Sequence, residues 1–229
     1  MGMVLLVRHG QASFGADDYD VLSETGIAQS SRLGAWLADA GVEPTALLHG
    51  ALRRQRDTAL AMVDAAGWST GPELDEGWDE FDHLGVVARA WDGSRLRSSD
   101  EPGSADAMDR RAFQEAFVEA TARWSGGAFD HEYDEPWPRF AGRVAAALDR
   151  ASAREGVTVV VSSGGPIALA CAALVDPAAT PAELPRLWNA FNTVCANTGV
   201  TRVITGSSGR RMLTFNEHSH LARDQVTYR

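Results

Sequence analysis

The stretch Val4-Leu5-Leu6-Val7-Arg8-His9-Gly10 places an apolar run directly before a cation, an imidazole and a glycine. Consecutive apolar residues of this kind predict a buried strand, and open α/β sheets bind their ligands at the carboxyl ends of such strands. An imidazole beside a guanidinium can attack phosphorus while the guanidinium holds the phosphoryl oxygens. A strand can also end on histidine without any function, so the tripeptide alone leaves both interpretations open.

The rest of the chain alternates between strand patterns and helix patterns. Short apolar runs predict further strands at about residues 45–48, 157–161, 199–204 and 211–215, with helical spacing of apolar residues between them. The run at 157–161 is almost entirely apolar, which is typical of a central parallel strand. The sequence therefore predicts an α/β fold, a three-layer α/β/α sandwich with a mostly parallel central sheet.

Acidic residues are concentrated in one segment. Residues 73–135 hold 17 Asp and Glu against 6 Arg, whereas the remainder is nearly balanced at 14 against 15. This asymmetry predicts an acidic, largely helical cap, inserted at about residues 78–136 into a single domain that spans 1–229. Within the cap, the polar stretch Ser98–Asp106 reads as a loop. The cap also contains a helical stripe that we expect to pack in a core, formed by Phe113, Phe117, Ala120 and Trp124.

The charge and the cysteines narrow the class of protein. A formal net charge of −10 argues against nonspecific binding to nucleic acid or to a membrane surface. All 21 basic residues are arginine, which excludes Schiff-base chemistry and a Walker-type loop, because both need a lysine amine. Arginine instead suits bidentate phosphate recognition. Without a membrane-length apolar stretch or a signal-peptide pattern, we expect a cytoplasmic protein, with Cys171 and Cys195 as buried thiols.

Three further segments carry groups suited to phosphate chemistry. Leu52–Ala59 places three arginines at a strand-to-helix junction, where backbone N–H groups favour an anion, although a solvated basic helix start would look the same. Glu80 stands beside aromatic residues, which suits a carboxyl group to proton donation, although most carboxylates in so acidic a segment are solvated. Ser162–Pro166 is a second strand-to-helix turn with exposed N–H groups.

Taken in order, these segments resemble the motifs of the histidine phosphatase superfamily, the phosphoglycerate mutase-like proteins. The resemblance spans nearly the whole chain. It rests on Leu6–Gly10, Leu22–Gly26 with Gln29, Leu52–Ala59, Val161–Ile167 and Asn216–Leu221.

The resemblance implies the residues of a phosphate site. His9 corresponds to the nucleophile that becomes phosphorylated, and Arg8 and Arg54 correspond to the two arginines of the pocket. Ser163 and Gly164, in the second strand-to-helix turn, complete the phosphate-binding set. Because these arginines supply the positive charge, the resemblance implies neither a metal nor another cofactor.

The resemblance also implies a proton donor between the second helix and the cap. Glu80 is the residue that we assign to this role, with Glu76 as the alternative because the motif spacing is loose here.

The sequence departs from the family pattern at three places, one of which is Gly15 in place of an asparagine that is often found there. Ser163 stands where the family has its second histidine, and Gln11-Ala12 replaces a common Glu-Thr pair. A serine hydroxyl donates one hydrogen bond but carries no charge, and losing a charge-assisted donor can cost roughly 10²–10³ in rate. Four other histidines could fold back to compensate, although an exposed or structural histidine is the favoured reading of each: His49, His83, His218 and His220.

Three functions follow from these residues. The first is a phosphomonoesterase, a hydrolase of the histidine acid phosphatase type, that hydrolyses a small phosphorylated metabolite through a phosphohistidine intermediate. The second is a phosphoglycerate mutase, which the acidic cap disfavours because a bisphosphate needs a basic pocket mouth. The third, kept open by Ser163, is a catalytically weak phosphate-binding or regulatory protein. The expected partner is a small phosphate ester, not nucleic acid or a membrane. A homodimer is compatible with the sequence, which does not decide the oligomeric state.

Overall fold

The computed structural model describes residues 2–13, 20–90 and 110–228, and of residues 110–114 it describes the backbone alone. The predicted loop Ser98–Asp106 and the side chain of Phe113 lie outside the described residues. The chain forms two compact units. The first comprises Met1–Glu80, Arg143–Ala178 and Arg186–Arg229, and the second comprises Phe81–Gly142 with Ala179–Pro185.

A six-stranded sheet forms the centre of the first unit. Its strands are β1 (Gly2–Arg8), β2 (Ala46–His49), β3 (Pro72–Leu74), β4 (Val157–Ser162), β5 (Val200–Gly206) and β6 (Gly209–Glu217). Their order is β3-β2-β4-β1-β5-β6, in which the first four are mutually parallel and the last two are antiparallel to their neighbours. The predicted mostly parallel α/β sheet is therefore confirmed. Strand β3 was not predicted, because three residues that begin with proline are too few to show a strand periodicity.

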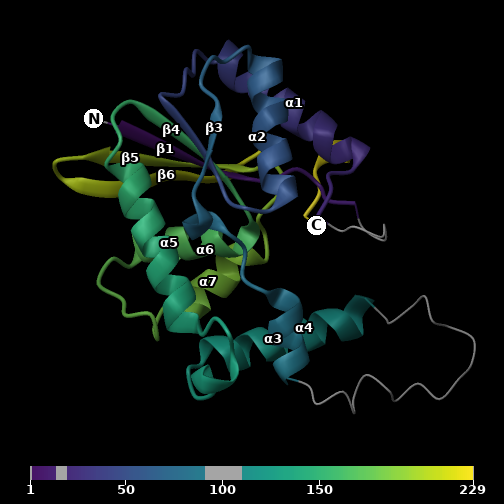
Figure 1. Cartoon of the computed structure of the whole chain (residues 1–229), viewed down its shortest axis with the longest axis vertical. Coiled ribbons are helices and arrows are strands. Elements are labelled where there is room, and N and C mark those ends of the chain that lie inside the picture. Colours follow the sequence, from purple (N-terminus) through teal and green to yellow (C-terminus); the bar gives the residue numbers. More distant parts are fainter. Residues whose placement is uncertain (1, 14–19, 91–109, 229) are drawn as a thin grey trace, which may run out of the picture. The chain divides into compact units, whose positions relative to one another are not determined.

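Helices cover both faces of this sheet (Figure 1). On one face lie α1 (Glu24–Asp39) and α2 (Arg53–Ala66), and Leu33 and Met62 from these helices pack in one core cluster with Leu5 and Val7 of β1. The intervening Leu6 is fully buried as well, and α6 (Gly164–Val175) packs against β1. Burial on both faces explains why β1 reads as a continuous apolar run.

Local signals set the start of α1 and bring the end of β1 against it. Ser23 is the N-cap of α1, and its hydroxyl accepts a hydrogen bond from the Gly26 N–H at 3.0 Å. A Cβ atom on Gly10 would lie 2.4 Å from the Gly26 carbonyl oxygen, so only glycine allows this close approach of loop and helix. His9 thus lies between strand β1, which precedes it, and Gly10, which is held against α1.

The second unit is helical and has an aromatic core. It contains α3 (His83–Ala90), α4 (Arg110–Ser125), a short 3-10 helix (Asp130–Glu132) and the first residues of α5 (Trp137–Ser152). Phe81 stacks on Trp124 with ring centroids 4.7 Å apart, and Trp137 meets Trp124 edge-on at 5.1 Å. Trp124 and Ala120 are fully buried, so these two residues of the predicted stripe do pack in a core.

The remaining elements belong to the first unit or run into it. They are the 3-10 helix η1 (Glu76–Trp78), the last part of α5, α7 (Pro185–Asn192) and the 3-10 helix η4 (Arg223–Gln225). Cys171 and Cys195 are free, buried thiols, as expected. Among the helices in the described ranges, none has both the length and the apolar character that a membrane crossing requires.

Candidate active site

His9 follows the last residue of β1 and is held through its backbone and its ring. Its N–H donates to the Ser162 carbonyl at 2.8 Å, and its own carbonyl accepts from Asn197 Nδ2 at 3.1 Å. The ring nitrogen Nδ1 lies 2.7 Å from the Gly10 carbonyl oxygen, which can only accept. Nδ1 therefore carries the proton, and Nε2 presents its lone pair to Arg54 Nε at 3.1 Å.

The electrostatic surroundings keep this imidazole neutral. The side chain is buried, and burial together with the positive charges of Arg54 and Arg8 lowers the pKa of His9 well below its usual value of 6.5. The hydrogen bond to the Gly10 carbonyl opposes this shift without cancelling it. At neutral pH His9 thus has an unprotonated Nε2, which is the form of histidine that can act as a nucleophile.

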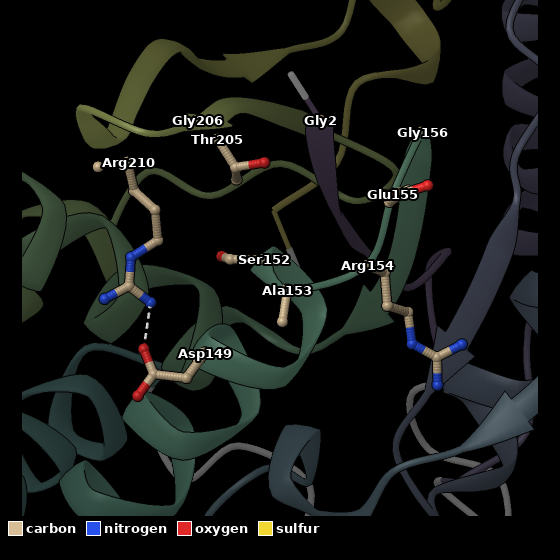
Figure 2. A pocket seen from close by; sticks show the side chains of 11 residues that line it. Gly2, Asp149, Ser152, Ala153, Arg154, Glu155, Gly156, Thr205, Gly206 and Arg210 are labelled. Atoms are coloured by element: carbon tan, nitrogen blue, oxygen red, sulfur yellow. Dashed lines mark hydrogen bonds and ion pairs between the residues drawn. The ribbon is translucent and has the colours of Figure 1, made fainter.

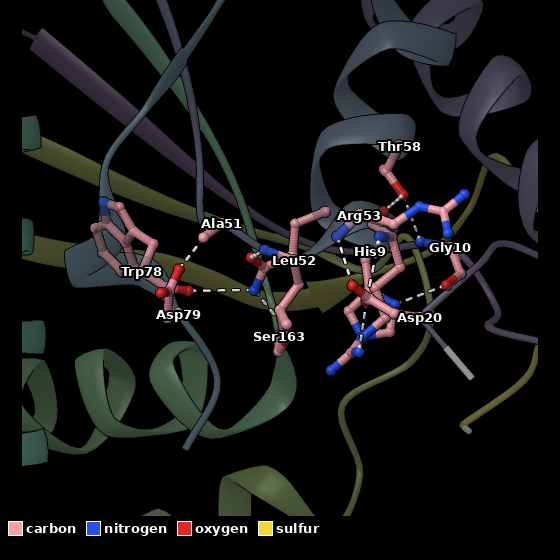
Figure 3. A network of polar contacts seen from close by, with 12 residues as sticks. His9, Gly10, Asp20, Ala51, Leu52, Arg53, Thr58, Trp78, Asp79 and Ser163 are labelled. Carbon is pink, nitrogen blue, oxygen red and sulfur yellow. Dashed lines mark hydrogen bonds and ion pairs between the residues drawn. The ribbon is translucent and has the colours of Figure 1, made fainter. Parts of the chain in front are cut away.

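Arg54 lies in the first turn of α2. Asp20, from the loop that precedes α1, reaches this turn beside Arg53 (Figure 3). The Nη1 atom of Arg54 forms a 2.8 Å ion pair with Asp20 Oδ1, and the other carboxylate oxygen accepts the Arg53 N–H at 2.8 Å. Of the three arginines in this segment, Arg54 is buried, whereas Arg53 and Arg56 are exposed. Asp20 therefore both caps the start of α2 and holds the guanidinium whose Nε faces His9.

Arg8 offers a hydrogen-bond donor without an acceptor. Its Nη1 donates to the carbonyl oxygens of Cys195 and Tyr228, the latter at 2.9 Å. Its Nε is buried and has no hydrogen-bond partner among the described residues. A Cβ atom built on Gly164 would lie 3.9 Å from this Nε, so the guanidinium lies beside the start of α6. A buried donor of this kind fits an oxygen of a bound anion.

The turn between β4 and α6 meets the segment that carries Glu80. The Gly165 N–H donates to Glu80 Oε2 at 3.1 Å, so this half-buried carboxylate lies at the start of α6. Register pairs Arg8 with Ser162, which sets Ser163 beside His9 at the carboxyl ends of adjacent strands. Glu76, by contrast, is exposed in η1 and lines a surface hollow with Arg143 and Arg150.

The four histidines that could have compensated for Ser163 have structural surroundings of their own. His49 Nδ1 lies 2.7 Å from the Gly50 carbonyl, and His218 Nδ1 lies 2.7 Å from the Asn216 carbonyl. His220 Nε2 lies 3.0 Å from the Thr198 hydroxyl, and His83 begins α3 in the second unit. The contacts of His49, His218 and His220 given above are to groups other than His9.

Four residues of this network were not predicted from the sequence as site residues. They are Asp20, Gln55, Thr58 and Asn197. Thr58 Oγ1 accepts the Gly10 N–H at 2.9 Å and donates to the Arg54 carbonyl at 2.7 Å, which ties the loop after β1 to α2. Thr58 stands four residues after Arg54 within the Leu52–Ala59 motif, and the family resemblance of that motif was the signal that could have identified it. Asp20 and Asn197 belong to irregular segments, where no periodicity indicates which side chain turns inward.

A concave region lies at the amino-terminal ends of the parallel strands, opposite to the end that carries His9. It has a volume of about 680 Å³ and lies where β1 begins, with Gly2, Gly156 and Thr205 in its lining (Figure 2). Two arginines border it, and both are ion-paired, Arg210 with Asp149 and Arg154 with Glu73. In the described part of the chain, no group of three His, Cys, Asp or Glu side chains is arranged to hold a metal ion.

Comparison with known proteins places this arrangement in a family. The profile of the histidine phosphatase superfamily (branch 1) matches residues 4–218. A 2,3-bisphosphoglycerate-dependent phosphoglycerate mutase of Corynebacterium jeikeium is 41% identical over 71 residues, which cover only 28% of each chain. The chain thus aligns with little more than a quarter of that curated relative.

Solved structures share the fold at low sequence identity. Phosphoserine phosphatase from Entamoeba histolytica matches with a TM-score of 0.62 and 18% identity, over 97% of this chain and all of the other. A mycobacterial glucosyl-3-phosphoglycerate phosphatase in complex with inorganic phosphate matches with 0.62 and 19%, over 97% and 100%. Phosphoglycerate mutase from Bacillus anthracis matches with 0.62 and 17%, over 96% and 94%. Since the superfamily profile covers almost the entire chain, this protein belongs to the histidine phosphatase superfamily, branch 1.

Proposed function

We propose that this chain is a phosphomonoesterase that hydrolyses a small phosphorylated metabolite through a phosphohistidine at His9. The observation that carries the proposal is the state of the imidazole. Its Nδ1 proton is committed to the Gly10 carbonyl at 2.7 Å, and its Nε2 lone pair faces Arg54 at 3.1 Å. Family membership and phosphatase neighbours support a phosphoryl-transfer reaction, and these residues supply the finer assignment.

In the first half-reaction, Nε2 of His9 attacks phosphorus while the bond from phosphorus to the ester oxygen breaks. The guanidinium groups of Arg8 and Arg54, with the N–H groups at the start of α6, hold the phosphoryl oxygens. The proton of Glu80 goes to the leaving oxygen, so the alcohol departs uncharged. The Gly10 carbonyl stabilises the positive charge that the phosphorylated ring acquires, because it accepts the Nδ1 hydrogen bond.

In the second half-reaction, water replaces the alcohol. The carboxylate of Glu80 takes a proton from the water, whose oxygen bonds to phosphorus as the bond from phosphorus to Nε2 breaks. Inorganic phosphate leaves, and His9 and Glu80 return to their starting states. Neither step calls for a metal or an organic cofactor, because the two arginines and backbone N–H groups carry the charge stabilisation. We also propose that the protein is cytoplasmic and that its binding partner is the small phosphate ester that serves as substrate.

Hydrolysis of p-nitrophenyl phosphate tests the proposal. We expect His9→Ala to abolish turnover and to abolish a phosphoryl adduct trapped by acid-free denaturation and detected by intact-protein mass spectrometry. His131→Ala, which changes an exposed histidine, is the matched control and keeps both. Binding of inorganic phosphate without any turnover would instead identify a phosphate-binding protein.

A mutase is the second candidate, because the 71-residue match is to a phosphoglycerate mutase. The two enzymes differ in the acceptor of the phosphoryl group. We expect the phosphorylated protein to release inorganic phosphate to water at the same rate with and without 3-phosphoglycerate. Transfer of the label to that acceptor, in place of release, would overturn the phosphatase in favour of the mutase.

A further inference from the structure

Gln55 is a fully buried polar residue in the first turn of α2, next to Arg54. Its side chain makes contacts on three sides. Nε2 donates to Ser163 Oγ at 2.9 Å and to the Trp78 carbonyl at 3.2 Å, and Oε1 accepts the Leu52 N–H at 3.4 Å. A buried amide that is hydrogen-bonded at both ends has a defined place in the structure rather than a solvated one.

These partners fix which way the amide points. The Trp78 carbonyl can only accept a hydrogen bond, and the Leu52 N–H can only donate one. The nitrogen of the amide must therefore face Trp78 and Ser163, and the oxygen must face Leu52. The space is also filled, because a Cβ atom on Gly50 would lie 2.2 Å from Gln55 Oε1.

This orientation determines how the Ser163 hydroxyl is used. Gln55 Nε2 brings only hydrogens, so Ser163 Oγ is the acceptor in that bond and its own hydrogen remains to be donated. Ser163 is the N-cap of α6, yet its side chain makes no capping hydrogen bond to that helix, which is the usual role of serine there. The residue is 1% exposed and stands beside His9 at the carboxyl ends of β4 and β1.

We infer that Gln55 is a positioning residue, which holds the Ser163 hydroxyl so that it donates its hydrogen to a phosphoryl oxygen on the substrate. This inference rests on the proposed function. The Ser163 hydroxyl, held by Gln55, then acts as a neutral hydrogen-bond donor at the position of a charged one. A neutral hydroxyl that is already aligned loses little entropy when the phosphoryl group arrives, so alignment partly offsets the missing charge.

A second contact keeps the role of Gln55 separable from general stability. The Trp78 carbonyl also accepts a hydrogen bond from the Ser162 hydroxyl at 2.7 Å. The segment that leads to Glu80 therefore retains an anchor when the Gln55 amide is removed. If Gln55 acts on the reaction, it acts through Ser163.

A double-mutant cycle tests this inference. Gln55→Met keeps the volume and removes the donors, and Ser163→Ala removes the hydroxyl. We expect Ser163→Ala to lower kcat/KM for p-nitrophenyl phosphate by roughly 10–100-fold. Gln55→Met should cost a similar factor in the wild-type background and about twofold or less in the Ser163→Ala background, because its target is gone.

Gln29→Met is the matched control, because Gln29 is also buried and bridges Gln225 and Thr227 through its Nε2. Its effect on rate should be the same in both backgrounds. The same cycle is measured on the affinity for inorganic phosphate. A wild type without turnover would overturn the proposed hydrolase activity, and the binding data would still test the coupling between Gln55 and Ser163. Three outcomes would overturn the positioning role. Gln55→Met could have equal effects in both backgrounds, or Ser163→Ala could leave both rate and affinity unchanged. The third outcome is a wild type that neither turns over the substrate nor binds phosphate.

Discussion

The carboxylate of Asp20 bridges two parts of α2, because one oxygen pairs with Arg54 Nη1 at 2.8 Å and the other accepts the Arg53 N–H at 2.8 Å. A single side chain therefore stabilises the helix start and orients the guanidinium whose Nε meets His9. The same anion cannot serve both purposes if its charge is removed or its position shifts.

Asp20→Ala should accordingly reduce both stability and activity. We expect a loss of roughly 0.5–2 kcal/mol in the free energy of unfolding, the usual range for a capping residue, and a lower kcat/KM because Arg54 loses its orientation. Urea unfolding and p-nitrophenyl phosphate kinetics measure the two effects. Asp57→Ala, which removes a half-exposed ion pair with Arg56, is the control and should change either quantity little. An Asp20→Ala enzyme with unchanged kcat/KM would contradict the orienting role.

The depressed pKa of His9 predicts activity at acidic pH. Burial, Arg54 and Arg8 all disfavour the protonated ring, so the reactive neutral form persists below the usual pKa of 6.5. We expect the acidic limb of the profile of kcat/KM against pH, as far as His9 sets it, to lie below 6.5. Arg54→Met removes one positive charge, so the imidazole should titrate at higher pH in NMR spectra, although burial keeps it below 6.5. A His9 resonance that titrates near 6.5 in the wild type would contradict the assignment of a neutral nucleophile.

His220 predicts a pH dependence of stability. Burial, with a smaller contribution from His218, lowers the pKa of His220 to about 4, against 6.5 for an ordinary histidine. Between these values the unfolded chain binds the proton and the folded chain does not, so stability is lost as pH falls through this window. The slope for one proton approaches ~1.4 kcal/mol per pH unit. Urea unfolding from pH 7 to 4 should show a shallower fall for His220→Gln than for the wild type, and an equal slope would contradict this prediction.

Glu80→Gln should distinguish leaving groups. An alkyl phosphate needs a proton on its departing oxygen, whereas p-nitrophenolate leaves unaided, so formation of the phosphoenzyme should slow more on the alkyl substrate. Rapid-quench measurement of that first step on both substrates gives the comparison. Glu76→Gln changes an exposed carboxyl group of the same segment and is the control. A loss in Glu76→Gln with none in Glu80→Gln would transfer the acid to Glu76.

The contact between Gln55 and Ser163 makes a prediction about restoring a histidine. Ser163→His alone should be poorly active, because Gln55 Nε2 lies 2.9 Å from the serine oxygen and fills the space that an imidazole needs. Gln55→Ala combined with Ser163→His opens that space and should exceed the single variant in kcat/KM by tenfold or more. Thermal unfolding should show the same order of stability. A single Ser163→His variant as stable and active as the double variant would contradict the steric account.

Sequence reasoning predicted the parts of this site that follow strands. Arg8 and His9 end an apolar run, so the strand pattern located them, whereas Arg54 was assigned from the resemblance of Leu52–Ala59 to the family motif. The interactions of Asp20 and Gln55 were not predictable in the same way. One lies in a loop without periodicity, and the other points across the sheet edge to a residue 108 positions away. Such long-range pairings depend on tertiary packing, which a single sequence does not display.

The two backbone carbonyl groups that hold Arg8, from Cys195 and Tyr228, orient its guanidinium without neutralising it. Arg54 already shares its charge with Asp20, and His9 is neutral. A phosphate dianion that enters between them therefore meets about one elementary charge of uncompensated attraction from these groups. Weak attraction acts on the product as well as on the substrate. We expect inorganic phosphate to inhibit the reaction only weakly. The product should dissociate quickly, so the site is soon free to bind the next substrate molecule.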